Sequence, residues 1–457
     1  MSLVELAIDD LRCIERAELQ LDPGHNLIWG GNGSGKTSLL EAIFLLGRGR
    51  SFRTRSSERL IRYGRERLVV FGRTGGLAAA GSFENGNAGS RWVELSDGSR
   101  RVSGDLGFSG EVDAAAGGLD AVPAGAAPGS GNRLGEESDS RRGRWPEVQP
   151  GRNTAAGGGG TGRTGYSSAI QSAELESAGQ PVLSQALGVQ VSRTDGTTAR
   201  ISGSNTKSLT ELTQVFPVQV IDPGIHKLVE EGGHRRRRWM DWAVFHVEHQ
   251  FGDWWLRYTR ALKQRNAALR THPAQAGVWD SELVRLGELI AAARGRLMEA
   301  LLPYWKESVL ALSGLEPELH YFKGWAQDTS LAEALAASKA RDETKRVTHP
   351  GPHRADVIVR MKGRPAREVL SRGQQKLVAV AMTLAQLHLL QSATQTTSTL
   401  LLDDPAAELD GEHLRRFIDQ VLRLKSQLVL TSLHPEFQLF GRPNRVFHVE
   451  QGRVKPA

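Results

Sequence analysis

Apolar and polar residues alternate near the start of the chain in a way that predicts short β-strands. The first strand runs from Leu3 to Ile8 and the second from Ile14 to Leu21, and a third, 27–29, leads into a glycine-rich loop. A helix is expected after the loop, because apolar residues recur at helical spacing: Leu39, Leu40, Ile43, Phe44 and Leu46. One face of this helix is therefore expected to pack on a sheet.

From about residue 225 to residue 345 the pattern is mostly helical. Aromatic residues gather in its first part, and we expect them to form core between helices rather than a base-stacking platform: Trp239, Trp242, Phe245, Phe251, Trp254, Trp255 and Tyr258. Apolar residues continue at helical spacing further on: Leu283, Leu286, Leu289, Ile290, Leu297, Leu301 and Leu302. This pattern predicts a helical lobe with a short coiled-coil-like pair rather than a long arm.

The final part returns to α/β character. Residues 399–402 and 428–430 are short, continuous apolar runs, which are typical of buried parallel strands. Between about residues 114 and 165, the chain is rich in Gly, Ala, Pro, Ser and Arg and contains almost no large apolar residues. Such a composition cannot offset the entropy of ordering, so a disordered insertion is expected, or alternatively an arginine-bearing arm that binds nucleic acid.

The amino-acid composition and net charge favour some classes of protein over others. A hydrophobic content of 39% over 457 residues supplies a sizeable core, and a single cysteine, Cys13, excludes an internal disulfide and suggests a packing residue in a reducing compartment. The N-terminus has no secretory pattern and no run of about 18 apolar residues appears, so we expect a cytoplasmic protein. The 58 Lys and Arg against 51 Asp and Glu give +7, which favours a polyanionic partner.

A complete phosphate-binding loop, G-x-x-x-x-G-K-T, lies between a predicted strand and the predicted helix. Its backbone N–H groups and helix N-terminus suit phosphate oxygens, Lys36 suits the β- and γ-phosphates of ATP, and Thr37 suits Mg²⁺. The predicted ATP-binding residues are Gly30, Gly31, Asn32, Gly33, Ser34, Gly35, Lys36, Thr37 and Ser38.

Two acids end the later apolar strand, as in a Walker B element. Asp403 is expected in the Mg²⁺ shell, and Asp404 is expected to act with Lys36 in catalysis by orienting or deprotonating the attacking water. A nuclease that uses both acids as metal ligands is an alternative, but the phosphate loop already explains them.

Just before that strand, the run 370–375 and its following helix resemble the signature of the ABC ATPase superfamily. The residues expected to bind ATP in trans are Ser371, Arg372, Gly373 and Gln374. The resemblance implies a fold of α/β class, an ABC-type P-loop ATPase head of mixed sheet and flanking helices plus the helical lobe. It also implies two ATP molecules sandwiched in a head-to-tail homodimer.

Three weaker matches accompany the signature. Gln219 ends an apolar stretch and resembles a Q-loop glutamine that completes the metal shell, and residues 406–410 resemble a D-loop through Ala407, Glu408 and Asp410. His434 lies just past a strand, displaced from the usual switch histidine. The predicted divisions are 1–105 and 180–224 for the first parts of the head, 106–179 for the insertion, 225–345 for the lobe and 346–457 for the rest of the head.

Five blocks in order resemble the bacterial RecF family, a group of ABC/SMC-type ATPases: residues 32–38, 49–54, 237–248, 351–356 and 370–374. The signature follows Lys36 by about 340 residues, too far for most transporter ATPases and too near for the long arms of SMC proteins. The resemblance implies a weak, DNA-stimulated ATPase of recombinational repair and replication-fork maintenance. It also implies binding of duplex DNA and single-strand gap junctions, and work with RecO and RecR to load RecA.

Arginines cluster after the phosphate-loop helix, and Arg50, Arg53 and Arg55 are the predicted DNA-binding residues. Without base-reading partners they favour contacts to the DNA backbone that depend on salt rather than on base sequence. Residues 235–238 are an alternative DNA-binding surface.

Asp404 stands where many ABC enzymes carry Glu, which favours slow turnover of ATP. An ABC/SMC-type ATPase of another repair or chromosome-maintenance complex and, less favoured, a transport ATPase are the competing interpretations.

Overall fold

The computed structural model describes residues 2–75, 92–94, 100–102, 184–206, 208–394, 397–407, 409, 411–435 and 440–457. The chain divides into two units, residues 1–88 with 181–457, and residues 89–180. In the second unit the structure describes one antiparallel pair, β5 (Trp92–Glu94) and β6 (Arg100–Val102). The insertion predicted at 106–179 lies outside the described residues.

The first sheet is antiparallel, and its strand order is β2-β1-β4-β7-β8-β9. Its strands are β1 (Ser2–Leu11), β2 (Ile14–Gln20), β4 (Arg67–Gly75), β7 (Gln185–Ser192), β8 (Gly196–Ile201) and β9 (Ser204–Asn205). The two strands predicted at the N-terminus are confirmed as β1 and β2.

The second sheet has the order β10-β14-β15-β3-β16-β17 and is parallel except for the last pair. Its strands are β3 (His25–Trp29), β10 (Val218–Ile221), β14 (Thr399–Leu402), β15 (Gln427–Ser432), β16 (Arg445–Glu450) and β17 (Arg453–Pro456). The parallel strands predicted at 399–402 and 428–430 are confirmed.

Alternation along the strands of this second sheet divides the interior into two cores. Leu27, Leu400 and Leu402 face a core shared with the long helices, whereas Ile28 and Leu401 face a core shared with the first sheet. Successive strand residues point to opposite faces, so each of these short strands contributes to both cores. The sheet is buried on both sides, which explains its continuous apolar sequence.

Helix α1 (Lys36–Arg48) lies between the two sheets and contacts strands of both. The sequence predicted one apolar face, but the helix is buried on nearly every side from Ser38 to Gly47. Gly47 permits this close fit, because a Cβ there would lie 2.4 Å from Val218 Cγ1. The helix that follows the phosphate loop is therefore held rigidly by the head.

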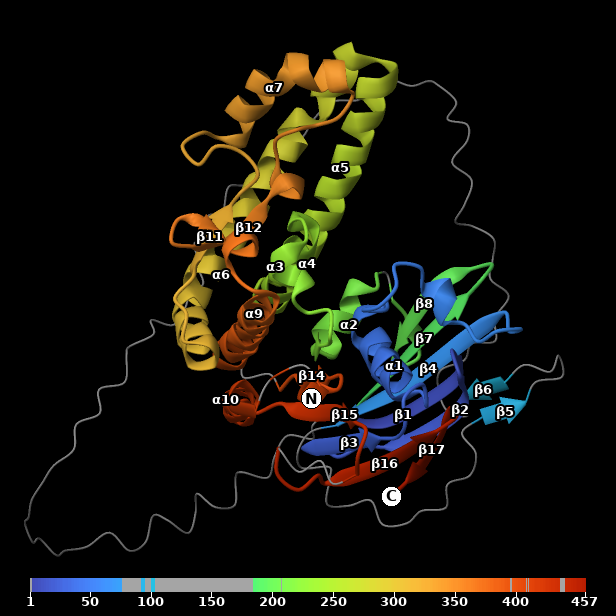
Figure 1. Cartoon of the computed structure of the whole chain (residues 1–457). Helices are drawn as coiled ribbons and strands as arrows, with labels where there is room; N and C mark the ends of the chain where they lie inside the picture. The colour runs from blue at the N-terminus through green and yellow to red at the C-terminus, as the bar shows by residue number, and fades with distance from the viewer. Residues whose placement is uncertain are drawn as a thin grey trace, which may run out of the picture. The chain divides into compact units, whose positions relative to one another are not determined.

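The remaining elements are mostly helical (Figure 1). The helices are α2 (Thr210–Val215), α3 (Lys227–Glu230), α4 (Gly233–Val247), α5 (Phe251–Thr271), α6 (Asp280–Ser313), α7 (Leu331–Lys345), α8 (Ala366–Val369), α9 (Arg372–Thr394) and α10 (Gly411–Leu422). Short 3₁₀ turns are η1 (Ser57–Leu60), η3 (Pro273–Trp279), η4 (Pro352–Arg354) and η5 (Pro405–Ala407). A small sheet joins β11 (Glu318–Phe322), β12 (Asp356–Met361) and β13 (Arg364–Pro365). The predicted helical lobe is thus present, with α5 packed against the longer α6.

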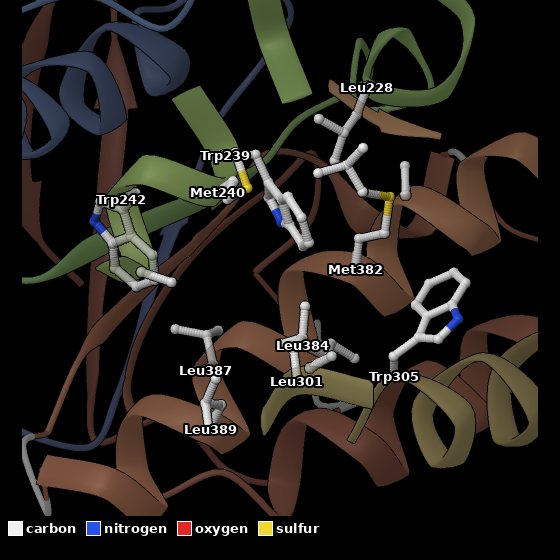
Figure 2. Close-up of a cluster of buried hydrophobic side chains, with 14 of the residues drawn as sticks. Leu228, Trp239, Met240, Trp242, Leu301, Trp305, Met382, Leu384, Leu387 and Leu389 are labelled. Atoms are coloured by element: carbon white, nitrogen blue, oxygen red, sulfur yellow. The ribbon is translucent and has the colours of Figure 1, made fainter. Parts of the chain in front are cut away.

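Helix α9 is the centre of the helical core. Figure 2 shows its Met382, Leu384 and Leu387 together with Leu301 and Trp305 of α6. The helix is long and apolar enough to cross a membrane, yet most of it is buried inside the protein. The aromatic residues predicted as core are confirmed as such, since all seven belong to this core or pack against it.

One buried ion pair ties α4 to α6. The Arg294 guanidinium, fully buried, donates from Nε and Nη2 to the two oxygens of Asp241 at 2.8 and 3.0 Å. Its Nη1 donates to the Pro352 carbonyl at 2.7 Å. The pair is bidentate and leaves little of either charge unsatisfied.

We predict that Arg294→Met lowers the free energy of unfolding by about 3 kcal/mol or more, because it removes both hydrogen bonds to the buried Asp241 carboxylate and leaves the more distant Arg237 as its neighbouring positive charge. The double variant Arg294→Met/Asp241→Leu should recover much of that loss. Urea denaturation followed by tryptophan fluorescence measures both. Additive losses in the double variant would show that the pair is not coupled.

Candidate functional site

The phosphate loop joins β3 to α1 across Gly30–Gly35. Gly33 has φ of 74°, a left-handed value that favours glycine, and a Cβ on Gly30 would lie 2.2 Å from the Val449 carbonyl oxygen. Lys36 Nζ donates to the carbonyls of Gly30 and Gly31 at 2.7 and 2.9 Å. Burial holds the pKa of Lys36 below its usual value, while Asp404 and Asp403 act in the opposite direction. The lysine therefore lies over the loop and within electrostatic range of both acids.

Asp403 lies beside the phosphate loop, as the sequence predicted. Its carboxylate accepts from Thr37 Oγ1 at 3.1 and 3.2 Å and from Thr431 Oγ1 at 3.0 Å. Burial raises the pKa of Asp403 above its usual value, against the effect of these two hydrogen bonds. Carboxylate and hydroxyl oxygens are ligands that Mg²⁺ prefers, so Thr37 and Asp403 fit the metal shell predicted for them.

Asp404 has an unusual backbone. Its φ of 49° is left-handed, which Asp tolerates better than most residues, and its N–H donates to Thr431 Oγ1 at 2.9 Å. One threonine thus holds both acids, donating to Asp403 and accepting from Asp404. Thr431 was not found from the sequence, although its place at the carboxyl end of the strand adjacent to β14 offered a signal.

Glu41 anchors two arginines next to the nucleotide loop. It is completely buried, and it accepts from Arg12 Nη2 at 3.0 Å and from Ser51 Oγ at 2.5 Å, while Arg53 Nη1 lies 3.6 Å away. Arg53 also lowers the pKa of Asp403, against the larger effect of burial, so it lies within electrostatic range of the nucleotide site. Sequence reasoning missed Glu41 and Arg12, since a buried acid on an apolar helix resembles an ordinary helix former.

Arg55 and Arg50 both lie near α4. Arg55 is exposed and close enough to lower the pKa of Arg238 and of His234, which belong to α4. Arg50 is half-buried and lies by Arg238. The predicted DNA-binding arginines and the alternative surface at 235–238 are therefore neighbours.

The signature begins α9 and is exposed. Ser371 Oγ accepts from the Gln374 N–H at 3.3 Å, and the Gln374 side chain accepts from the Ser371 N–H at 3.0 Å. This reciprocal pair is a capping box, which fixes the start of the helix. Ser371, Arg372 and Gly373 are all exposed, and a Cβ on Gly373 would meet no atom within 4 Å. The helix N-terminus is thus open to a ligand or to another molecule.

Gln219 lies within β10, not at its end as the sequence suggested, because the strand continues to Ile221. Its side-chain oxygen accepts from Arg48 Nη2 at 3.2 Å and its amide donates to Gln386 at 3.1 Å. The residue that follows the strand is Asp222, whose pKa is raised by burial and by the nearby Asp403 carboxylate. A role for Gln219 as a metal ligand stays a prediction, and Asp222 is an acid of this edge that sequence reasoning missed.

The remaining predictions concern the D-loop, His434 and Cys13. Ala407 ends η5, whereas Glu408 and Asp410 of the predicted D-loop lie outside the described residues. His434 is exposed, and its N–H donates to Ser432 Oγ at 3.1 Å. The expectation that Cys13 is a packing residue is wrong, because the turn between β1 and β2 exposes it, with Sγ 3.9 Å from Ser38 Oγ.

Comparisons with known proteins agree with this geometry. The family model of the RecF/RecN/SMC N terminal domain matches residues 2–79 and 169–455. The chain is 31% identical to the DNA replication and repair protein RecF of Pseudomonas aeruginosa strain LESB58 over 99% of its own length and 97% of the relative's. It is also 31% identical to the protein of that name from Cellvibrio japonicus strain Ueda107, over 99% of each chain.

The fold is shared with solved structures of the recombination mediator protein RecF. The structure with ATP has a TM-score of 0.70 at 20% identity and covers all of this chain and 97% of its own. The stretch that the family match leaves out, 80–168, overlaps most of the predicted insertion. From its sequence relatives and its ABC-type head, the chain belongs to the RecF family.

Proposed function

We propose that the chain is a RecF-like, ATP-dependent DNA-binding protein of recombinational repair and replication-fork maintenance. The observation that carries the proposal is the joining of Lys36, Thr37 and Asp403 in one ATP site, in a chain whose relatives are named DNA replication and repair proteins. A solved neighbour named RecF-ATP supports ATP as the nucleotide. We propose, as in the divisions predicted from the sequence, a head that is interrupted by the insertion and by the lobe.

Hydrolysis is proposed to be slow and stimulated by DNA. Thr37 and Asp403 would hold Mg²⁺, which would neutralise phosphate charge, and Asp404 would orient or deprotonate the attacking water. The bond from Asp404 N–H to Thr431 fixes the backbone at this residue. Its side chain is one methylene shorter than Glu, which suits a slow switch rather than a rapid motor.

ATP is proposed to join two copies head to tail. The P-loop of one copy would take the triphosphate, and Ser371, Arg372, Gly373 and Gln374 of the other would close over it. The exposure of the capped helix start supports this arrangement, since its N–H groups are available to an anion. Ala407, Glu408 and Asp410 are proposed to line the same interface.

The joined heads are proposed to bind duplex DNA and single-strand gap junctions through Arg55, Arg53 and Arg50. RecR and RecO are proposed as partners, and loading of RecA is proposed as the outcome. The name of the solved neighbour, which includes the RecFOR pathway, supports this proposal. The proposed location is the cytoplasm. An ABC/SMC-type ATPase of another DNA repair or chromosome-maintenance complex is the alternative function.

The first prediction concerns the head-to-tail dimer. Light scattering should show a monomer without nucleotide and a dimer with a non-hydrolysable ATP analogue. Lys36→Ala and Gly373→Glu should each remain monomeric, the second because a negative side chain would meet the partner's triphosphate while its own surroundings are open. Mixing the two variants should restore a dimer with one intact site. A mixture that stays monomeric would contradict the arrangement.

The second prediction concerns the catalytic acid. Asp404→Asn should keep ATP affinity and lower the hydrolysis rate about 100-fold or more, because it removes the base. Asparagine tolerates the left-handed backbone at this position, so the fold is preserved. Phosphate release measures the rate, and an unchanged rate would remove Asp404 from catalysis.

The third prediction concerns DNA. Arg55→Glu/Arg59→Glu reverses two exposed arginines, Arg55 and its neighbour Arg59 in η1. It should weaken duplex binding and reduce the slope of log affinity against log salt by about two units, since each phosphate contact contributes about one. ATP affinity should be unchanged. The matched control is Arg260→Glu/Arg270→Glu, which reverses two exposed arginines on α5. Equal effects of the two double variants would indicate net charge alone.

A further inference from the structure

A cavity of about 400 Å³ lies where α1 and α2 meet α4 and α5. Arg48 and Arg50 enter it from the C-terminal end of α1, and His234, Arg237 and Arg238 enter it from α4. Lys36 lies at the opposite end of α1, about 18 Å away along the helix axis at 1.5 Å per residue. The cavity is therefore separate from the ATP site.

The charges in this cavity are unbalanced. Asp241 is the acid in its lining, and that carboxylate already accepts two hydrogen bonds from Arg294. Burial lowers the pKa of Arg50 to about 10, with Arg238 adding to the shift, and Arg50 in turn lowers the pKa of Arg48. Cations held close together in a partly buried space raise the free energy of the folded protein unless an anion joins them.

Polar groups remain available in the cavity. The side chains of half-buried Arg50 and exposed Arg238 have no hydrogen bond or ion pair with any residue that the structure describes, whereas Arg237 donates to the Ala355 carbonyl. Trp242 lines the cavity with its indole Nε1 buried and without a hydrogen-bond partner in the described part of the chain. In Figure 2 this nitrogen faces away from Leu384 and Leu387 of the helical core.

The rest of the lining is partly aromatic. Partly buried Phe245 and Trp255 give it aromatic surface beside Leu209, Thr210 and Thr213, whereas Trp242 is almost wholly buried, with the Arg48 guanidinium 5.1 Å from its ring centre. The volume lies within the range of small-molecule sites, well above that of a single phosphate ion. Aromatic faces stack on nucleic-acid bases, and arginines bind phosphate oxygens. An anion that carries a planar ring fits this lining better than a bare phosphate.

We propose that this cavity is a second nucleotide site, which takes the phosphate of a nucleotide on Arg50 and Arg238 and its base against the aromatic wall. The nucleotide is either free or the phosphorylated end of a DNA strand. The second source is favoured by the neighbouring positive charge, since burial, exposed Arg55 and half-buried Arg235, which is paired with Glu231, all lower the pKa of Arg238.

A ligand in this cavity would affect the ATP site through two sets of contacts. Arg48 donates to Gln219 on β10, next to the strand that ends in Asp403. Arg50 precedes Ser51, which donates to Glu41, the acid that holds Arg53. A ligand that binds these arginines would compete with Gln219 for Arg48 and would fix the position of Arg50, the residue before Ser51.

The test uses the full chain carrying Lys36→Ala, so that the P-loop does not contribute. Calorimetry at low salt compares inorganic phosphate, dAMP, and a ten-residue oligo-dT with a 5′-phosphate or a 5′-hydroxyl. We expect dAMP to bind more tightly than phosphate. A preference for the 5′-phosphorylated strand over its hydroxyl form identifies a DNA end as the source, and binding of dAMP alone identifies a free nucleotide.

Adding Arg50→Gln/Arg238→Gln should weaken the bound probe at least tenfold, while Arg260→Gln/Arg270→Gln, with the same loss of charge, should leave it unchanged. The bound probe should also raise the melting temperature of the Lys36→Ala protein, a readout that needs no cavity variant to fold. No binding of any probe, no rise in melting temperature, or equal effects of the two double variants would overturn the proposal. ATP affinity measured separately in the chain with Lys36 intact keeps a failure here distinct from a failure of the proposed function.

Discussion

The hydrogen bond between Thr37 and Asp403 connects residues that are 366 positions apart, and the rest of the site depends on the sheet that makes it possible. Strands β3, β14 and β15 are parallel neighbours, so their carboxyl ends meet at one edge. The phosphate loop follows β3, and Asp403 follows β14, at that edge. An insertion or a helical lobe between them changes nothing, provided that the strands still pair in this register.

The protein contains two arrangements of fully or partly buried arginines, one paired with an acid and one without. Arg294 and Asp241 satisfy each other with two hydrogen bonds, which suits a structural tie between helices. Arg48 and Arg50 have no such acid, and their cavity gathers further arginines instead. The first arrangement ties two helices together, whereas the second leaves half-buried positive charge without an acid, which is the physical basis for proposing the cavity as an anion-binding site.

Much of the fold could be predicted from the sequence, because continuous apolar runs and helical spacing report directly on burial. Lys36, Thr37 and Asp403 could be placed in one site for a similar reason, since each adjoins a strand or helix with a recognisable pattern. Thr431, Glu41 and Asp222 could not, because nothing local distinguishes a threonine or acid that meets the site only after the strands pair. The environment of Arg50 was equally hidden, since its neighbours come from α4, almost two hundred residues away.

Gly30 to Thr37 alone would fit many enzymes, and what sets this chain apart is the combination of that loop with a distant, exposed signature and a basic surface beside it. The central claim is that ATP occupancy controls DNA binding. Affinity for a gapped duplex, measured with ATP, without ATP and in Lys36→Ala with ATP, tests it most directly. The account predicts tight binding in the first case and weak binding in the other two, and equal affinity in all three would contradict it.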